Sequence, residues 1–219
     1  MMPNAAQSIV LATRNAGKIR ELEAPLRTFG LSVLGLDAFP ELPEVEETGE
    51  TFEANALLKA RAAAEGSGLV AVADDSGLMV DALGGAPGVR SARYGADHTP
   101  AFPGESQDAR NIRKLLDALA EMPEERRGAR FVTVMAVCKP GGADPLIVRG
   151  EWEGRILAAP RGSGGFGYDP VFFDPVAGRA AAELTPEEKL ARSHRGRALR
   201  ELLRLWPAFW SRRAEPLAE

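Results

Sequence analysis

Apolar runs of strand length alternate with amphipathic segments along the first half of the chain. Three runs predict buried strands and a fourth is a further candidate: SIVLAT (8–13), LSVLGL (31–36), LVAVA (69–73) and LMVDAL (78–83). Between them, Asn15 predicts the start of a helix that ends at Gly30, and residues 51–64 have strong helical propensity. Pro25 lies inside the first helix and predicts that it is kinked or divided.

The second half of the chain has a different order of elements. Residues 108–122 form an amphipathic pattern typical of a helix, and residues 186–204 predict further helical segments. Between these helices, several runs predict consecutive antiparallel strands and a last short strand; they are RFVTVMAVC, PLIVRGEWEG, RIL and VFF. Because strands and helices alternate early and strands run together later, the sequence predicts an α/β fold with a mixed sheet flanked by helices.

Length and composition fit an ordinary globular protein. The 219 residues suit a single domain, or one domain with two lobes, and 45% of them are apolar and 26% charged. The net charge of −4 argues against a general polyanion binder, so we expect no nucleic-acid partner. One cysteine, Cys138, cannot form an intrachain disulfide, and we expect a buried thiol in a cytoplasmic protein. We expect neither a secretion signal at the amino terminus nor a membrane span.

Two adjacent carboxylates, Asp74 and Asp75, follow an apolar run and precede Gly77. Adjacent side chains on an extended strand point to opposite sides, so both could bind one ion only if the backbone turned between them, as Gly77 would permit. Hard oxygen ligands at a strand end suit Mg²⁺, which typically takes one or two carboxylates together with substrate phosphates. The alternative is a turn with two solvated charges.

A second candidate site lies at the start of the first helix. Lys18 falls in the first helical turn, where a cation interacts unfavourably with the helix dipole. An anion bound at the free N–H groups of that helix end would relieve this unfavourable interaction. Glu47 adds a carboxylate before the next helix, and on that helix Asn55 and Lys59 are four residues apart and share a face. The alternatives are a solvated lysine at position 18, a charged loop that caps the next helix at Glu47, and solvated side chains at Asn55 and Lys59.

Two further segments contain candidates for recognition of a nucleobase. The string GSGGFG (162–167) resembles a dinucleotide-binding fingerprint, but Tyr-Asp-Pro and a strand follow it where that fingerprint requires a helix. Its aromatic residue Phe166 can stack on a base, and Asp169 can accept hydrogen bonds. His194 lies at a predicted helix start beside Arg195. The alternatives are a tight turn around a core phenylalanine and a basic helix face.

Five motifs in fixed order, taken together, resemble the inosine triphosphate pyrophosphatase family, also called XTP/dITP diphosphatases. The motifs are TRNAGK, EETGETFEANALLKA, ADDSGLMVDALGGAPGVRSARYG, GGFGYDPVF and SHRGRAL, and the resemblance covers residues 8–203. It implies an elongated mixed α/β fold with two lobes and a central active-site cleft, usually as a homodimer. It also implies Mg²⁺-dependent hydrolysis of ITP, dITP and XTP to the monophosphate and pyrophosphate, which cleanses the nucleotide pool.

The resemblance also assigns roles to individual residues. Asp75 matches the catalytic base, and Glu47 and Asp75 match the metal ligands. Substrate contacts are implied for Thr13, Arg14, Asn15, Ala16, Gly17, Lys18, Ser76, Phe166, Gly167, Tyr168, Asp169, Lys189, His194 and Arg195. The chemistry of the reaction suggests that Lys18, Lys59 and Lys189 neutralise phosphates. Phe166 would stack on the base, and Asp169, His194 and Arg195 would distinguish a 6-oxo from a 6-amino group.

The chain departs from the family pattern at two places. Arg14 stands where many members have glycine, and residues 95–106 are longer than the usual form, which predicts an insertion in a surface loop. Two other functions remain open at this point. One is a related pyrophosphatase that acts on modified pyrimidine nucleotides or 7-methyl-GTP. The other is a non-catalytic nucleotide-binding or nucleic-acid-binding module that uses the basic carboxy-terminal helix.

Overall fold

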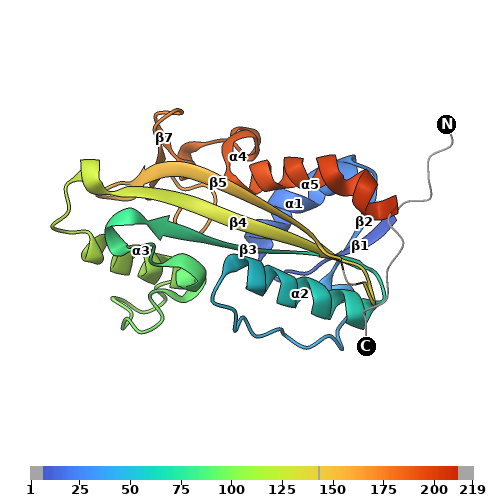
Figure 1. Cartoon of the computed structure of the whole chain (residues 1–219). Helices are drawn as coiled ribbons and strands as arrows, with labels where there is room; N and C mark the ends of the chain where they lie inside the picture. The colour runs from blue at the N-terminus through green and yellow to red at the C-terminus, as the bar shows by residue number, and fades with distance from the viewer. Residues whose placement is uncertain (1–6, 143, 212–219) are drawn as a thin grey trace. The chain divides into compact units, whose positions relative to one another are not determined.

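The computed structural model describes residues 7–142 and 144–211 of the chain. The described strands form one sheet in the order β2-β1-β3-β4-β5-β6-β7 (Figure 1). In chain order they are β1 (Gln7–Leu11), β2 (Leu31–Gly35), β3 (Val70–Val80), β4 (Gly128–Cys138), β5 (Leu146–Ile156), β6 (Phe172–Asp174) and β7 (Arg179–Ala180). β1 pairs in parallel with β2 and β3, whereas β6 is antiparallel to β5 and β7. The mixed sheet predicted from the sequence is therefore confirmed.

The helices begin at the polar residues that the sequence offers as caps. They are α1 (Ala16–Thr28), α2 (Phe52–Ser67), α3 (Gln107–Ala118), α4 (Pro186–Arg192) and α5 (His194–Ser211). Asn15, Thr51, Ser106 and Thr185 each accept a hydrogen bond from a backbone N–H of the first turn that follows, which satisfies donors that have no partner within the helix. Among the described helices, none has the length and apolar character that a bilayer span requires.

The chain divides into two compact units, and three strands pass from one unit to the other. Unit 1 comprises the chain up to Asp75, Thr133–Gly150 and the chain from Arg197 onward, and unit 2 comprises Ser76–Val132 and Glu151–Gly196. The boundaries fall within β3, β4 and β5, so one half of each of these strands contributes to each unit.

In unit 1 the strands are covered by helices on both faces. Figure 1 shows α1 and α5 on one face of the sheet and α2 on the other. Ile9 and Val10 of β1 and Val72 of β3 are buried, and because adjacent side chains of a strand point to opposite faces, Ile9 and Val10 fill the apolar layers on both faces of the sheet. The small residues Ala56 and Ala60 of α2 are fully buried, which allows this helix to pack closely. This packing brings the polar ends of α1 and α2 next to β3.

Unit 2 has a core rich in aromatic residues. Phe131 of β4, Trp152 of β5 and Phe172 of β6 lie in mutual contact, with ring centroids 4.5–6.2 Å apart. Leu115 and Leu119, from the apolar face of α3 and the residue after it, are fully buried in the same cluster. This core supports the loop around Phe166 and the start of α5.

Two predictions about strand boundaries are wrong. The runs 69–73 and 78–83 were expected as two strands, but β3 continues from Val70 to Val80, and residues 81–83 form a 3-10 helix instead. PLIVRGEWEG and RIL are likewise parts of the single strand β5. At Gly154 a Cβ atom would lie 2.5 Å from the Phe172 ring, so this glycine permits close packing against the ring and does not end the strand.

Other expectations from the sequence have mixed outcomes. α1 remains one helix with Pro25 inside it, and the helix predicted to end at residue 122 ends at Ala118. Cys138 is buried, as expected.

Most residues of the 95–106 loop are exposed, but Glu105 is buried, bonds the Arg113 side chain at 3.0 Å, and so anchors the loop on α3. Residues 1–6, which belong to the amino terminus expected to lack a secretion signal, lie outside the described residues.

Candidate active site

The two adjacent aspartates lie within β3 and not at its end. The strand remains extended through Asp74, Asp75 and Gly77, so the backbone does not turn here and the predicted strand end at residue 73 is wrong. Both carboxylates are buried, and on an extended strand they point to opposite faces of the sheet. Each therefore meets a different helix of unit 1, and a lysine on that helix compensates its charge. These distant lysines explain why two charged residues remain inside a buried strand.

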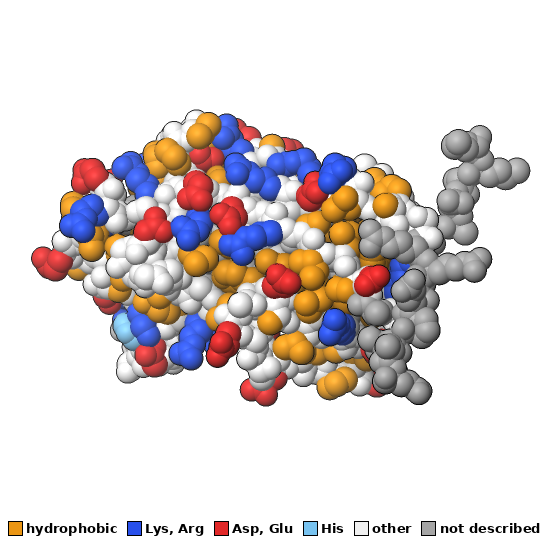
Figure 2. Space-filling view, in the orientation of Figure 1, with side chains coloured by type: hydrophobic (Ala, Val, Ile, Leu, Met, Phe, Trp, Pro, Cys, Tyr) orange, Lys and Arg blue, Asp and Glu red, His pale blue; other side chains and the backbone are white. Residues whose placement is uncertain are grey.

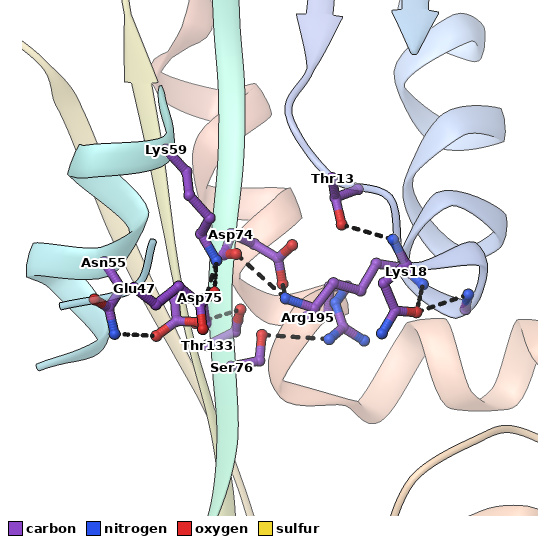
Figure 3. Close-up of polar contacts among 12 residues, drawn as sticks. Thr13, Lys18, Glu47, Asn55, Lys59, Asp74, Asp75, Ser76, Thr133 and Arg195 are labelled. Atoms are coloured by element: carbon purple, nitrogen blue, oxygen red, sulfur yellow. Dashed lines mark hydrogen bonds and ion pairs between the residues drawn. The ribbon is translucent and has the colours of Figure 1, made fainter. Parts of the chain in front are cut away.

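The start of α1 supplies the partner of Asp74. Asn15 caps the helix by accepting hydrogen bonds from the N–H groups of Gly17 at 2.9 Å and Lys18 at 3.2 Å, and Thr13 accepts one from Asn15 N–H at 3.2 Å. Lys18 Nζ lies 3.0 Å from the Asp74 carboxylate and also donates to the Asp74 carbonyl at 3.2 Å (Figure 3). The negative charge of Asp74 thus compensates the lysine that the helix dipole disfavours at this position.

On the other face of β3, side chains from α2 and the preceding loop converge on Asp75. Asn55 donates to Oδ2 of Asp75 at 3.2 Å, and Lys59 donates to its Oδ1 at 3.2 Å. Lys59 Nζ also contacts Oε1 of Glu47 at 2.7 Å, so one ammonium group bridges two carboxylates (Figure 3). Asn55 and Lys59 act together because residues four apart lie on the same helix face, as the sequence predicts.

Burial and the charge of the partner shift the pKa values of Asp75 and Lys59 in opposite directions. Burial raises the pKa of Asp75, the positive charge of Lys59 opposes that effect, and repulsion from Glu47 adds to it, so that the pKa lies above its ordinary value. Burial alone would lower the pKa of Lys59, but the negative charges of Asp75, Asp74 and Glu47 together raise it. The lysine therefore remains charged, and a second cation at Glu47 and Asp75 would favour the ionised form of both carboxylates.

The carboxylate oxygens of Glu47 and Asp75 are of the type that magnesium prefers. Both carboxylates lie within hydrogen-bond distance of Lys59 Nζ, so two hard oxygen donors lie close together beside this ammonium group. Within 7–142 and 144–211, no group of three or more His, Cys, Asp or Glu residues could hold a metal. Two carboxylates suffice for Mg²⁺, which usually completes its shell with water and substrate phosphate oxygens.

In unit 2, the glycine-rich loop folds around Asp169. One oxygen of this carboxylate, Oδ2, accepts hydrogen bonds from Phe166 N–H at 2.9 Å and from Lys189 Nζ at 2.6 Å. Lys189 also lies over the Phe166 ring, 4.9 Å from its centroid. A side chain at Gly165 would lie 2.0 Å from the same carboxylate, and φ there is +73°, so only glycine fits. Lys189 thus binds the aromatic loop through Asp169 and Phe166.

The start of α5 adds two buried side chains to unit 2. His194 stacks on Phe131, with centroids 4.8 Å apart and an interplanar angle of 13°. Arg195 lies over the Phe166 ring at 5.6 Å and donates to Ser76 Oγ at 3.3 Å. Phe166 with Arg195 over its ring, together with His194, the neighbour of Arg195 in the chain, supplies groups that can stack on a planar base and hydrogen-bond its edge.

The structure therefore places the predicted residues in two groups, one in each unit. Unit 1 holds the segment from Thr13 to Lys18 together with Glu47, Lys59 and Asp75, and unit 2 holds Ser76, Phe166 to Asp169, Lys189, His194 and Arg195. Arg14 and Ala16 are exposed, and Tyr168 is buried with its hydroxyl donating to Ser91 O at 2.9 Å.

Two contacts of the candidate site could not be predicted from the sequence. Phe131, which supports His194, appeared only as a strand residue, and Asp108, which accepts a hydrogen bond from Gly167 N–H at 2.8 Å, appeared only as a helix residue.

Comparison with known proteins matches nearly the whole chain to one family. The model of the Ham1 family covers residues 9–205. A protein of Nitratidesulfovibrio vulgaris named dITP/XTP pyrophosphatase is 63% identical over 93% of this chain and 97% of its own length. A protein of the same name from Escherichia coli K12 is 49% identical over 90% of this chain and 96% of its own length.

Solved structures agree with this assignment. A HAM1 protein from Coxiella burnetii superposes with a TM-score of 0.81 at 44% identity, and covers 92% of this chain and 99% of its own. A nucleoside-triphosphatase described as dITP/XTP pyrophosphatase, from Mycobacterium abscessus, gives a TM-score of 0.70 at 48% identity, and covers 90% of this chain and 99% of its own.

Proposed function

The chain belongs to the Ham1 family, and from this premise we propose that it is a nucleoside triphosphate pyrophosphatase that hydrolyses dITP, ITP and XTP. The relatives named dITP/XTP pyrophosphatase resemble this chain along nearly their full length. The observation that carries the proposal is the cluster around Asp75, where a buried carboxylate is bonded by Asn55 and Lys59 with Glu47 beside it. Such a cluster suits a reaction that brings water and a polyphosphate together.

In the proposed reaction Asp75 acts on the attacking water. It orients the water and accepts its proton as the oxygen bonds to the α-phosphorus. The bond from that phosphorus to the α–β bridging oxygen breaks, and pyrophosphate leaves with the bridging oxygen. Lys18 and Lys59 neutralise the phosphate oxygens, because both are cations held in fixed positions by carboxylates. The nucleoside monophosphate remains as the second product.

Glu47 and Asp75 are the residues that would hold Mg²⁺ in this enzyme. The bound ion would supply charge neutralisation on the phosphate oxygens. The roles of Asn55 and Lys59 are defined without it, since they fix the orientation of Asp75 from the adjacent helix face.

Unit 2 is proposed to recognise the base. Phe166 stacks on the purine, while Asp169, His194 and Arg195 distinguish the 6-oxo from the 6-amino edge. Lys189, which the sequence suggested as a phosphate ligand, bonds Asp169 and lies against Phe166, so we assign it to the base-binding loop. Guanine also carries a 6-oxo group, so rejection of GTP would depend on its 2-amino group.

A pyrophosphate-release assay tests the proposal. The purified chain is offered ITP, dITP, XTP, GTP, ATP, 7-methyl-GTP and a modified pyrimidine nucleoside triphosphate, each with and without Mg²⁺. We expect release of pyrophosphate from ITP, dITP and XTP when Mg²⁺ is present, and none from these substrates without it. Preferential hydrolysis of 7-methyl-GTP or of modified pyrimidine nucleotides would instead support the related pyrophosphatase, and nucleotide binding without product would support the non-catalytic module.

The charge distribution favours the enzyme over a nucleic-acid-binding module. On the face shown in Figure 2, blue and red side chains are interspersed, and the chain has a net charge of −4. A nucleic-acid-binding surface would typically show basic residues gathered on one face. We further propose a cytoplasmic homodimer, as the sequence resemblance implies, and sedimentation equilibrium of the purified chain would measure its mass in solution.

A further inference from the structure

The loop that carries Phe166 is held by side chains from several elements of unit 2. Asp169 accepts the N–H of Phe166, and the buried hydroxyl of Tyr168 donates to Ser91 O. The residue between these two anchored positions is Gly167, whose φ of +59° lies in the left-handed region. Its N–H donates to Asp108 Oδ2 at 2.8 Å. The peptide that follows the aromatic ring is therefore tied to α3.

Asp108 lies in the first turn of α3 but is not the residue that caps this helix. Ser106 is the cap, because its side chain accepts a hydrogen bond from Ala109 N–H at 3.1 Å. The Asp108 carboxylate reaches 59 positions along the chain to Gly167. A role restricted to the helix dipole would not require that contact, whereas a role in loop placement depends on it.

We propose that Asp108 is a positioning residue for base recognition, which acts by fixing the peptide of Gly167 and thereby the ring of Phe166. The proposal rests on the function proposed above. Two cations, Lys189 and Arg195, lie near the Phe166 ring at 4.9 and 5.6 Å from its centroid. Asp169 and Asp108 bond the N–H groups of Phe166 and of the residue that follows it, so together they restrain the backbone that carries the ring.

The test uses three variants with matched chemistry. Asp108→Ala removes the acceptor, Asp108→Asn keeps an acceptor oxygen but removes the charge, and Ser106→Ala weakens the start of α3 without touching the loop contact. Two competitive inhibitors of ITP hydrolysis probe separate parts of the substrate: inosine, which has the base but no phosphate, and tripolyphosphate, which has no base.

In Asp108→Ala we expect the inhibition constant of inosine to rise by about 3- to 10-fold, which is the range that one hydrogen bond provides. The inhibition constant of tripolyphosphate should not change. Asp108→Asn and Ser106→Ala should both remain close to wild type for both inhibitors. An unchanged constant for inosine in Asp108→Ala, an equal change for both inhibitors, or the same effect in Ser106→Ala would overturn the proposal.

A second measurement does not depend on activity. Amide hydrogen exchange at Gly167 should be faster in Asp108→Ala than in the wild type, and close to wild type in Ser106→Ala. Equal exchange in all variants would show that the bond does not hold the loop. Failure of the proposed function would give a different result, because the wild type itself would then release no pyrophosphate from ITP, dITP or XTP.

Discussion

At the residue scale, Asp74 and Asp75 contact different partners because they point to opposite faces of one strand. Asp75 is held by Asn55 and Lys59 and is the proposed acceptor of the water proton. Asp75→Asn keeps the size and shape of the side chain but removes its charge. We expect turnover of ITP to fall by about 10²- to 10⁴-fold, the contribution typical of a general base. Pyrophosphate release measures the loss, and an unchanged circular dichroism spectrum is the control; turnover above half of wild type would exclude the proposed role.

We expect Asp74 to position Lys18. Its buried carboxylate anchors Lys18, a proposed phosphate ligand, at 3.0 Å. Asp74→Asn should raise KM for ITP by about 10-fold, because a hydrogen bond to a charged group contributes about 1.5 kcal/mol and 1.4 kcal/mol is tenfold in affinity. Steady-state kinetics should show a smaller effect on kcat. If Asp74 were a metal ligand instead, kcat would collapse and the apparent affinity for Mg²⁺ would fall.

At the scale of elements, substitution by alanine distinguishes a glycine that is needed for close packing from one that is not. Gly154→Ala would place Cβ 2.5 Å from both the Phe172 ring and the Phe173 carbonyl, so β5 must shift or the core must repack. We expect the free energy of unfolding to fall by about 1–3 kcal/mol, the usual cost of overpacking. Gly66→Ala is the matched control: in α2 its Cβ would meet only the movable end of Leu42, and alanine favours a helix. Urea unfolding compares the two, and equal midpoints would contradict the prediction.

Features that depend on neighbouring residues could be predicted from the sequence, and features that depend on distant partners could not. Helix starts were predictable, because Asn15 and the apolar spacing that follows it act locally. The continuity of β3 and β5 was not, because it depends on partners far away along the chain. Lys18 and Lys59 compensate the charges of the two aspartates, and the Phe172 ring occupies the space beside Gly154. The five motifs predicted the candidate site residues, but not the contact of Asp108 with Gly167. This contact joins a residue outside the motifs to a residue inside one of them, 59 positions apart.

At the scale of the whole molecule, the proposed phosphate chemistry and the proposed base recognition belong to different units. Lys59 bonds the carboxylates of unit 1, whereas His194 stacks on Phe131 in the core of unit 2. Substitutions in the two units should therefore have different kinetic signatures. Lys59→Met should lower kcat/KM for ITP and for ATP by the same factor, since both substrates carry the same triphosphate.

His194→Ala should instead lower kcat/KM for ITP much more than for ATP, by about 10-fold or more in the ratio. A site that hydrogen-bonds one edge of a base rejects analogues that lack this edge, because its buried polar groups then lose their partners. His98→Ala, in the loop at residues 95–106, should leave both values unchanged, since His98 lies in neither group of site residues. Parallel assays of the three variants with both nucleotides measure the ratio. An equal loss for ITP and ATP in His194→Ala would assign His194 to folding or phosphate binding, and base discrimination would then rest on Phe166 and Asp169.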